Sequence, residues 1–266
     1  MKTYYYAHTG HRIGLDRFRR SVAILNELEE DITLLTSDYR IAQVARDFGI
    51  EKSVGVDVVR NIPQIANHGD RLIFDSDEAN PLMLEDMKQY FSTFIHIKND
   101  TVAVQKKFFE AKKREKTVKL TYFFGDDDYE KDLQEHFDFI EGLNPHLQLG
   151  FYYFLDYEDA LKKKFPNYFE FEEYDEMIMS TKVLITCSPQ AVLDSIATGG
   201  KPIYVEREDY AQDFEELFAS LNVPIIKNYE KNHILEILKT IDDRKYENIE
   251  SKCNKIMSFI KESLIL

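Results

Sequence analysis

The chain has 266 residues, 44% of them hydrophobic and 31% charged, a composition typical of a globular protein with one large or two medium domains. Its formal net charge of −14 argues against nucleic acid or an anionic membrane as a partner held by electrostatic attraction. The two cysteines, Cys187 and Cys253, are too few for a disulfide framework, and no apolar run approaches the roughly 20 residues that span a bilayer. The opening MKTYYYAH has no signal-peptide apolar region, so we expect a cytoplasmic protein.

The first half of the chain alternates short apolar runs with segments of helical period. In the first helical segment, Leu15, Phe18, Val22 and Leu25 recur at spacings of three and four, which predicts one apolar stripe. The expected strands are residues 3–6, 32–36, 54–58, 72–75 and 94–97, and the expected helices are residues 15–29, 41–48 and 82–90.

The second half repeats this alternation, which predicts parallel sheets covered by helices on both faces. The highly charged stretch QKKFFEAKKREK separates the two halves, so we expect Rossmann-like domains at residues 1–113 and 114–266. We expect the closing segment 246–266 to be a helix that packs back across a domain. The expected strands are residues 118–124, 147–154, 183–186, 202–205 and 224–226, and the expected helices are residues 129–140, 175–180, 191–198 and 212–221.

The stretch HTGHRIGLDRFRR, residues 8–20, follows the first expected strand. Ligands of parallel α/β sheets bind at the carboxyl ends of strands, where a strand leads into a loop and a helix. Gly10 and Gly14 allow close backbone approach, and the helix start offers unpaired N–H groups to an anion. Three arginines near the helix start, Arg17, Arg19 and Arg20, do not complement the positive end of the helix dipole, which favours an anion site. The alternative is a solvated loop with arginines on an exposed helix face.

The stretch LIFDSDEANP places Asp75 and Asp77 directly after another expected strand. One interpretation is a polar group at the ligand-binding edge of the sheet. The other, equally favoured, is that Asp77 caps the turn or helix that follows.

In the stretch LTYFFGDDDYEKDL, Gly125 ends a strand, and Asp126, Asp127 and Asp128 precede an expected helix. Acidic residues at a helix start complement its dipole. The separated ligand pattern of a calcium loop is absent. Capping and solvation therefore explain these aspartates better than a metal does, and we expect ligand binding to need no divalent metal.

The stretch VLITCSPQAVLDSIATGGKPIYV, residues 183–205, predicts a strand, a small polar turn, a helix and a second strand. Ser188 and Gln190 stand where the helix N-terminus can present backbone donors to a diphosphate, and Asp194 lies one turn further on. Cys187 is a weak candidate nucleophile, because no dedicated histidine base is evident in the sequence.

These segments, in this order, resemble the nucleotide-sugar hydrolases of pseudaminic acid biosynthesis, the PseG family, a short relative of MurG-like glycosyltransferases. The resemblance covers most of the chain and implies an α/β protein of two Rossmann-like domains, GT-B-like, with an interdomain cleft. The matching stretches are Gly14–Arg20 for G-x-G-H-x-x-R, Ile73–Asp77 for IID-x-Y, Phe124–Asp127 for GG-[ST]-D, Pro189–Asp194 for S-T-x-x-E, Gly200–Pro202 for GKP and Tyr210–Gln212 for NQ.

Three positions depart from this family pattern. Asp16 replaces the second glycine, Arg17 stands where the family has its proposed histidine base, and Asp194 replaces the glutamate that is usually placed to hold the ribose. A guanidinium cannot accept a proton at neutral pH, although it binds phosphate through two hydrogen bonds. His11, six residues before Arg17, is the alternative base.

We therefore expect a nucleotide-sugar, UDP-linked, to bind with its nucleotide in the second half of the chain. The protein is then a glycosyltransferase or a divergent, very slow UDP-sugar hydrolase of surface-glycan biosynthesis. The alternative is a non-catalytic nucleotide-sugar-binding or partner protein that has lost its base. No cofactor is expected. The expected site residues are His11, Arg17 and Asp75 for catalysis, Gly125, Ser188, Pro189, Gln190, Asp194 and Gln212 for the nucleotide, and Gly14 and Arg20 for the anion or substrate.

Overall fold

The chain folds into two compact units in the computed structural model, which describes residues 1–28, 30–209 and 214–265. Unit 1 comprises Met1–Gly10, Leu15–Gln105 and Ser251–Leu266, and unit 2 comprises His11–Gly14 and Lys106–Glu250. The expected domains, 1–113 and 114–266, differ from these units because the closing helix belongs with unit 1 and a short segment near the N-terminus with unit 2.

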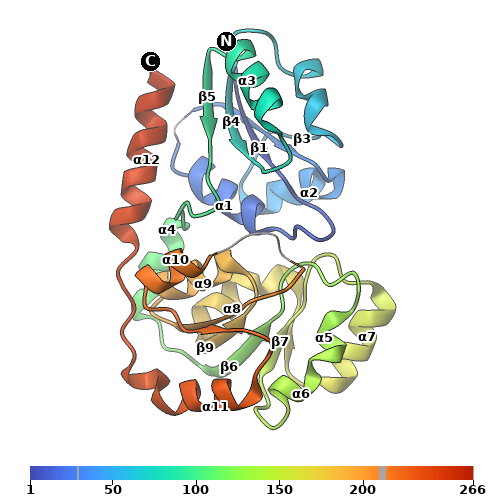
Figure 1. The fold of residues 1–266 in the computed structure, drawn as a ribbon, viewed down its shortest axis with the longest axis vertical. Coiled ribbons are helices and arrows are strands. Elements are labelled where there is room, and N and C mark those ends of the chain that lie inside the picture. Colours follow the sequence, from blue (N-terminus) through green and yellow to red (C-terminus); the bar gives the residue numbers. More distant parts are fainter. Residues whose placement is uncertain (29, 210–213, 266) are drawn as a thin grey trace. The chain divides into compact units, whose positions relative to one another are not determined.

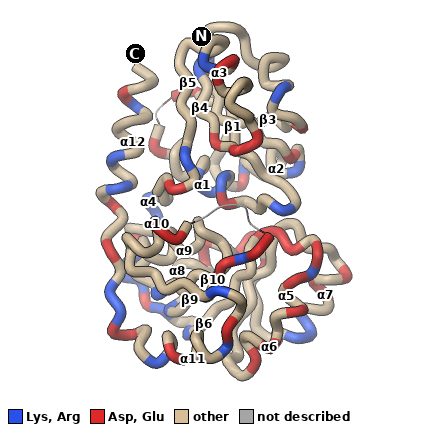
Figure 2. The backbone as a smooth tube through the Cα atoms, viewed as in Figure 1, with Lys and Arg blue, Asp and Glu red and all other residues tan. Residues whose placement is uncertain are grey.

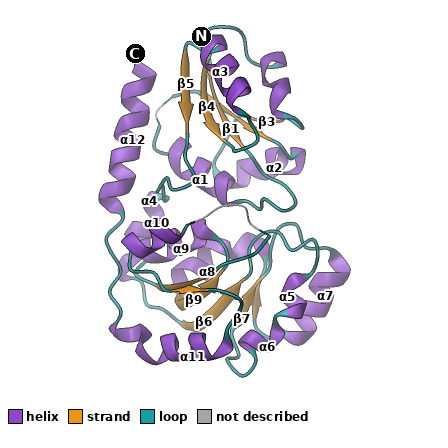
Figure 3. Ribbon diagram, viewed as in Figure 1, coloured by secondary structure: helices purple, strands orange, loops and turns teal. Residues whose placement is uncertain are grey.

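Unit 1 contains a five-stranded sheet in the order β3-β2-β1-β4-β5, and all its neighbouring strands are parallel (Figures 1 and 3). The order reverses between β1 and β4, the kind of switch point at which doubly wound sheets bind ligands. The strands are β1 (Thr3–Ala7), β2 (Ile32–Thr36), β3 (Ser53–Gly55), β4 (Arg71–Asp75) and β5 (Thr93–His96). The helices are α1 (Asp16–Leu25), α2 (Tyr39–Val44), α3 (Pro81–Tyr90) and α12 (Glu250–Ile265), with 3-10 turns at Ala45–Phe48 and Val59–Gln64.

Unit 2 contains a six-stranded parallel sheet in the order β11-β10-β9-β6-β7-β8, which reverses between β6 and β9. The strands are β6 (Val118–Phe123), β7 (His146–Gln148), β8 (Tyr168–Phe169), β9 (Thr181–Thr186), β10 (Lys201–Val205) and β11 (Ile225–Ile226). The helices are α4 (Lys106–Glu110), α5 (Asp132–Glu135), α6 (Phe137–Ile140), α7 (Leu155–Lys164), α8 (Tyr174–Ser180), α9 (Pro189–Ala197), α10 (Glu215–Ser220) and α11 (Lys231–Thr240), with 3-10 turns at Ala111–Lys113, Phe171–Glu173 and Ile241–Asp243.

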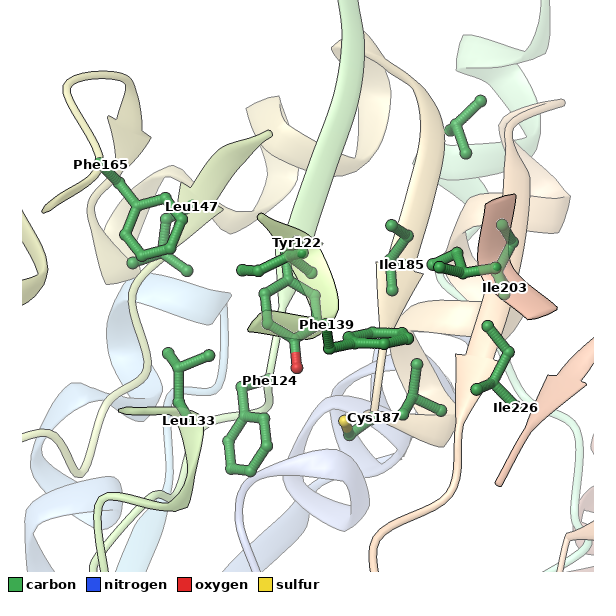
Figure 4. Close-up of a cluster of buried hydrophobic side chains, with 14 of the residues drawn as sticks. Tyr122, Phe124, Leu133, Phe139, Leu147, Phe165, Ile185, Cys187, Ile203 and Ile226 are labelled. Atoms are coloured by element: carbon green, nitrogen blue, oxygen red, sulfur yellow. The ribbon is translucent and has the colours of Figure 1, made fainter. Parts of the chain in front are cut away.

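The core of unit 2 is built from the apolar residues of its central strands, whose second halves are buried throughout. Tyr122, Ile185 and Ile203, from three neighbouring strands, lie in one cluster with Phe139 of α6 (Figure 4). Strands of a parallel sheet are buried on both faces, so they read as unbroken apolar runs rather than as alternating patterns. In unit 1 the same principle holds, since every residue of β1 is buried.

The expected strand at residues 147–154 is wrong beyond Gln148. The chain turns at Gly150, where an added Cβ would lie 2.5 Å from the carbonyl oxygen of Gly125, and α7 begins at Leu155. Two aspects of α7 explain its helical form: acidic residues in its first turn and three lysines in its last turn, which both complement the helix dipole.

The expected helix at residues 129–140 begins only at Asp132, because Lys131 has φ +64°. It is divided into two short helices, α5 and α6, at His136, which lies outside helical geometry. The helix expected at 15–29 ends at Leu25. Acidic and basic residues are interspersed along both units (Figure 2). Among the described residues, no helix has both the length and the apolar character to cross a bilayer.

Candidate functional site

Two polar clusters stand at the switch points of the two sheets, one in each unit. In unit 1, β1 and β4 end side by side, with Ala7 paired to Asp75. In unit 2, β6 and β9 end side by side, with Phe123 paired to Thr186. The polar segments singled out in the sequence follow these four strand ends, as expected for parallel α/β sheets.

Asp75 is the centre of the unit 1 cluster and is fully buried. Arg20 donates to it twice, from Nη2 to Oδ1 at 2.5 Å and from Nε to Oδ2 at 2.9 Å, and the Tyr5 hydroxyl donates to Oδ2 at 2.9 Å. Burial disfavours a charged guanidinium, yet the facing carboxylate raises the pKa of Arg20 above its usual value. Asp75 therefore joins β4 to α1, and its catalytic role stays a prediction.

Arg17 lies beside this pair, with its side chain only 4% exposed. Its Nη2 is 2.9 Å from Asp77 Oδ2 and 3.2 Å from Asn99 Oδ1, and its Nη1 is 3.2 Å from His8 Nδ1. A guanidinium can only donate, so the hydrogen bond runs from Arg17 to His8 Nδ1, which also lies 3.7 Å from Asp77 and 3.6 Å from Glu78. His8 is not among the expected site residues, although its position directly after β1 is a signal that could have found it.

The three consecutive aspartates after Gly125 are all buried. Asp128 caps α5 by accepting hydrogen bonds from the N–H groups of Asp132 and Leu133, and the Tyr157 hydroxyl donates to it. Burial raises the pKa of the Asp128 carboxyl to about 6. The expected capping role therefore fits Asp128.

Asp127 instead holds the segment that carries His11. Its Oδ1 lies 3.0 Å from His11 Nδ1, and its Oδ2 accepts the backbone N–H of Arg12 at 2.8 Å. Arg12 has φ +65° and Gly14 has φ +71°, so left-handed backbone bends the segment at both positions. These contacts place His11 and Gly14 in unit 2, while Arg17, Arg20 and Asp75 belong to unit 1.

Arg207, after β10, supports the same loop and is missed by sequence reasoning. It is buried, and its Nη1 donates to the carbonyl oxygens of Asp127 at 2.7 Å and Phe124 at 3.4 Å. Its guanidinium lies 4.2 Å from the centre of the Phe124 ring and pairs with Asp209 at 2.6 Å. An arginine two residues after an expected strand is the signal that could have found it.

The turn into α9 has the predicted form of a helix start. Ser188 is the N-cap and accepts the N–H of Ala191 at 3.1 Å, and Pro189 occupies the first turn. Gln190 Nε2 donates to Asp194 Oδ1 at 2.9 Å, and the Tyr174 hydroxyl donates to Asp194 Oδ2 at 2.8 Å.

The structure thus brings Ser188, Gln190 and Asp194 together at the start of and along the buried helix α9. This helix follows β9, and Gly125 follows β6, the strand next to β9. Gln212 lies outside the described residues. Cys187 is buried, and that burial raises the pKa of its thiol to about 12, which disfavours a nucleophilic thiolate at neutral pH.

A metal site was not expected in the sequence. Within the described ranges, no group of three or more His, Cys, Asp or Glu side chains is arranged to hold a metal ion. Whether ligand binding needs a metal stays a prediction.

The whole chain is similar in fold to solved structures of nucleotide-sugar epimerases. The UDP-GlcNAc 2-epimerase of Methanocaldococcus jannaschii, in complex with UDP-GlcNAc and UDP, matches with a TM-score of 0.55 at 10% identity, over 98% of this chain and 100% of that one. The UDP-GlcNAc 2-epimerase of Neisseria meningitidis, bound to UDP-GlcNAc, matches with a TM-score of 0.53 at 11% identity, over 100% of both chains.

These similarities, together with the two parallel α/β sheets, show that the chain has the GT-B fold of two Rossmann-like units. The fold expectation is therefore confirmed. A scan against models of protein families finds no match, and neither does a search of curated proteins.

Proposed function

We propose that this chain binds a UDP-sugar and transfers its sugar to an acceptor. Support comes from its end-to-end similarity in fold to two enzymes whose structures hold UDP-GlcNAc, together with its own polar loops at the switch point of unit 2. The single observation that carries the proposal is the start of α9, where capped backbone and buried polar side chains meet at the carboxyl end of β9.

In this proposal the diphosphate binds at the N-terminus of α9, because the positive end of the helix dipole favours negative charge there. Gly125, with φ +122°, lets the neighbouring loop approach the ligand closely. Asp194 is held on both oxygens by Gln190 and Tyr174, an arrangement suited to a fixed acceptor for ribose hydroxyls. Gln212 is assigned to the nucleotide by resemblance alone.

Transfer to an acceptor is favoured over rapid hydrolysis of the PseG type. The resemblance places Arg17 where that family has its histidine base, and Arg17 is charged and paired with Asp77. A surface glycan is the acceptor class that the resemblance implies. Loss of the base from this position also favours a second candidate, a nucleotide-sugar-binding protein without catalysis.

The test is calorimetric titration of the full chain with UDP, with ADP, GDP and TDP as comparisons. We expect UDP to bind, and at 100 times its dissociation constant to stabilise the fold by roughly 2.7 kcal/mol, visible as a rise in Tm. Asp194→Asn should weaken UDP binding, whereas Asp242→Asn, an exposed control in unit 2, should not. Failure of every diphosphate to bind at millimolar concentration overturns the proposal.

Turnover separates the two candidate functions. Release of UDP from a panel of UDP-sugars, measured with a coupled assay and with added acceptor glycans, supports transfer. UDP binding without any release favours the non-catalytic protein. Chelation with EDTA should leave UDP binding unchanged, and a loss that magnesium or manganese restores would contradict the expectation of metal independence.

A further inference from the structure

His11 and Asp127 form a dyad at the loop that follows β6. His11 Nδ1 lies 3.0 Å from Asp127 Oδ1, and the Asp127 side chain is 1% exposed while that of His11 is 38% exposed. The other carboxylate oxygen accepts the N–H of Arg12, and Arg207 donates to the Asp127 carbonyl oxygen. Asp127 is thus held both at its carboxylate and at its backbone, and the imidazole that its carboxylate contacts reaches solvent.

This contact determines which ring nitrogen carries the proton. An ionised carboxylate only accepts, so the hydrogen bond requires the proton on His11 Nδ1. In the neutral ring, Nε2 is then unprotonated and can accept a proton, while Asp127 stabilises the imidazolium that forms. A histidine oriented in this way by a buried carboxylate is the arrangement found in general bases.

Aromatic side chains surround the imidazole. The centre of the His11 ring lies 5.0 Å from those of Tyr129 and Tyr152 and 6.2 Å from that of Phe154. Tyr129 and Phe154 are 45% and 46% exposed and lie 5.6 Å apart, whereas Tyr152 is buried. The dyad is therefore flanked by two half-exposed aromatic rings, which offer apolar surface beside a proton acceptor.

The dyad lies at the loop next to the proposed nucleotide site. This loop leaves β6, α9 leaves β9, and the two strands are neighbours whose ends are joined by a hydrogen bond of 3.1 Å from Cys187 N to Phe123 O. A ligand whose diphosphate lies at the start of α9 therefore has its next group within reach of the β6 loop. In a nucleotide-sugar, that next group is the sugar.

We propose that His11 and Asp127 are the proton-transfer pair of this protein, and that Tyr129 and Phe154 form the surface on which the sugar ring lies. The proposal rests on the proposed function. During transfer, the acceptor oxygen bonds to the anomeric carbon while the bond from that carbon to the UDP oxygen breaks. UDP leaves with the electron pair, and the acceptor's proton passes to His11 Nε2.

The first test is the tautomer of His11, read from ¹⁵N and ¹H correlations of the imidazole in histidine-labelled protein at pH 8. The His11 signals are assigned by their loss in His11→Gln. We expect the neutral ring to be protonated on Nδ1 and unprotonated on Nε2. A ring protonated on Nε2 overturns the inference, whatever the nucleotide does.

The second test compares UDP with UDP-glucose, UDP-galactose and UDP-GlcNAc by calorimetry. Tyr129→Leu and His11→Gln should bind UDP as the wild type does, but should bind the preferred UDP-sugar about tenfold more weakly, the scale of one lost contact. His233→Gln, an exposed histidine of α11 in the same unit, is the matched control and should change neither affinity.

Turnover adds a third readout, because a positioned general base contributes about 10²–10⁴-fold. His11→Gln should lose that factor in kcat while its UDP affinity stays unchanged, and a kcat within about twofold of the wild type overturns the catalytic role. If the wild type and both variants bind each UDP-sugar with equal affinity, the assignment of Tyr129 and Phe154 as the sugar-binding surface is overturned. Absence of UDP binding in all proteins instead breaks the proposed function, and the His11 tautomer still decides whether the dyad exists.

Discussion

The buried aspartate at the switch point of unit 1 is paired with a guanidinium group and that of unit 2 with an imidazole, although both sheets are parallel and both reverse their strand order there. In unit 1, Asp75 is fully buried between Arg20 and Tyr5. In unit 2, Asp127 is buried to the same degree as Asp75, but the side chain of its partner His11 is more than a third exposed. The same residue type, an aspartate after a central strand, has two different partners.

This comparison teaches that the partner decides what a buried carboxylate can do. An arginine stays protonated at any accessible pH, so the Arg20–Asp75 pair holds α1 against β4 without exchanging protons. A histidine changes its charge near neutral pH, so the same carboxylate can orient a base. Breaking the Arg20–Asp75 pair should therefore lower the free energy of unfolding, and breaking the His11–Asp127 pair should lower kcat.

The largest expected effect is in unit 1. Arg20→Met removes the guanidinium that donates two hydrogen bonds to the buried Asp75 and leaves only Arg17, whose Nε lies 3.6 Å from Oδ1, as a charged neighbour. We expect the free energy of unfolding to fall by about 3–5 kcal/mol. Urea unfolding followed by circular dichroism measures this, with the exposed Arg60→Met as the control. A loss below about 1 kcal/mol would contradict a structural role for the pair.

The next effect depends on pH and concerns Asp128, whose pKa burial raises to about 6. Because the folded state then binds a proton that the unfolded state has already released, this carboxyl contributes stability that is present below about pH 4 and lost as the pH rises through about 6. The contribution is about 2–3 kcal/mol at most. Asp128→Asn keeps an oxygen that can cap α5, but its stability should not fall in this way as the pH rises. Urea midpoints of both proteins across the weakly acidic range up to neutral pH measure the difference, and parallel pH profiles would sink the prediction.

Tyr174 tests whether Asp194 depends on its buried hydrogen bonds. Tyr174→Phe removes a donor to Asp194 Oδ2, and we expect a loss of about 1.5–3 kcal/mol, as for a hydrogen bond to a charged group. The matched control is Tyr168→Phe, since the Tyr168 side chain is 39% exposed, and its effect should stay within about 0.5 kcal/mol. Equal effects of the two substitutions would show that Asp194 does not need Tyr174.

The smallest effect is expected at Arg12, whose backbone N–H binds the carboxylate of the dyad. Its side chain forms an exposed ion pair with Glu130, and its backbone has φ +65°. Arg12→Gly removes the weak pair but suits the left-handed backbone, so its Tm should equal or exceed that of the wild type. Arg12→Ala should melt below Arg12→Gly. The reverse order would show that the ion pair matters more than the backbone.

The fold was predictable because parallel strands buried on both faces leave unbroken apolar runs in the sequence. The strand at Ile32–Thr36 was predicted with its observed bounds. The prediction failed at residues 149–154, where aromatic residues that favour strands form a turn, because Gly150 packs directly against the loop of Gly125. That packing joins segments distant in the chain and leaves no local signal.

The places of the candidate polar residues in the fold were predictable, but their hydrogen-bond partners were not. Asp75 stands at a strand end and Ser188 at a helix start, as local patterns indicate, and Asp194 lies further along the same helix. Their partners Tyr5 and Tyr174 belong to other elements. His8 after β1 and Arg207 after β10 were missed, because position after a strand was their only signal and neither has a motif around it. The nucleotide and sugar assignments stay predictions.

The sequence by itself determined the class of fold and the polar segments at the strand ends, because apolar periodicity, glycines and capping residues act on neighbours a few positions away. Only the tertiary structure decided which side chain forms a hydrogen bond or ion pair with each carboxylate. His11 follows β1 closely in the chain, yet it pairs with Asp127 on the loop after β6, while Arg17 and Arg20 stay with unit 1. Such pairings depend on which loops meet when the chain folds, and that information lies in contacts between distant residues rather than in any local pattern.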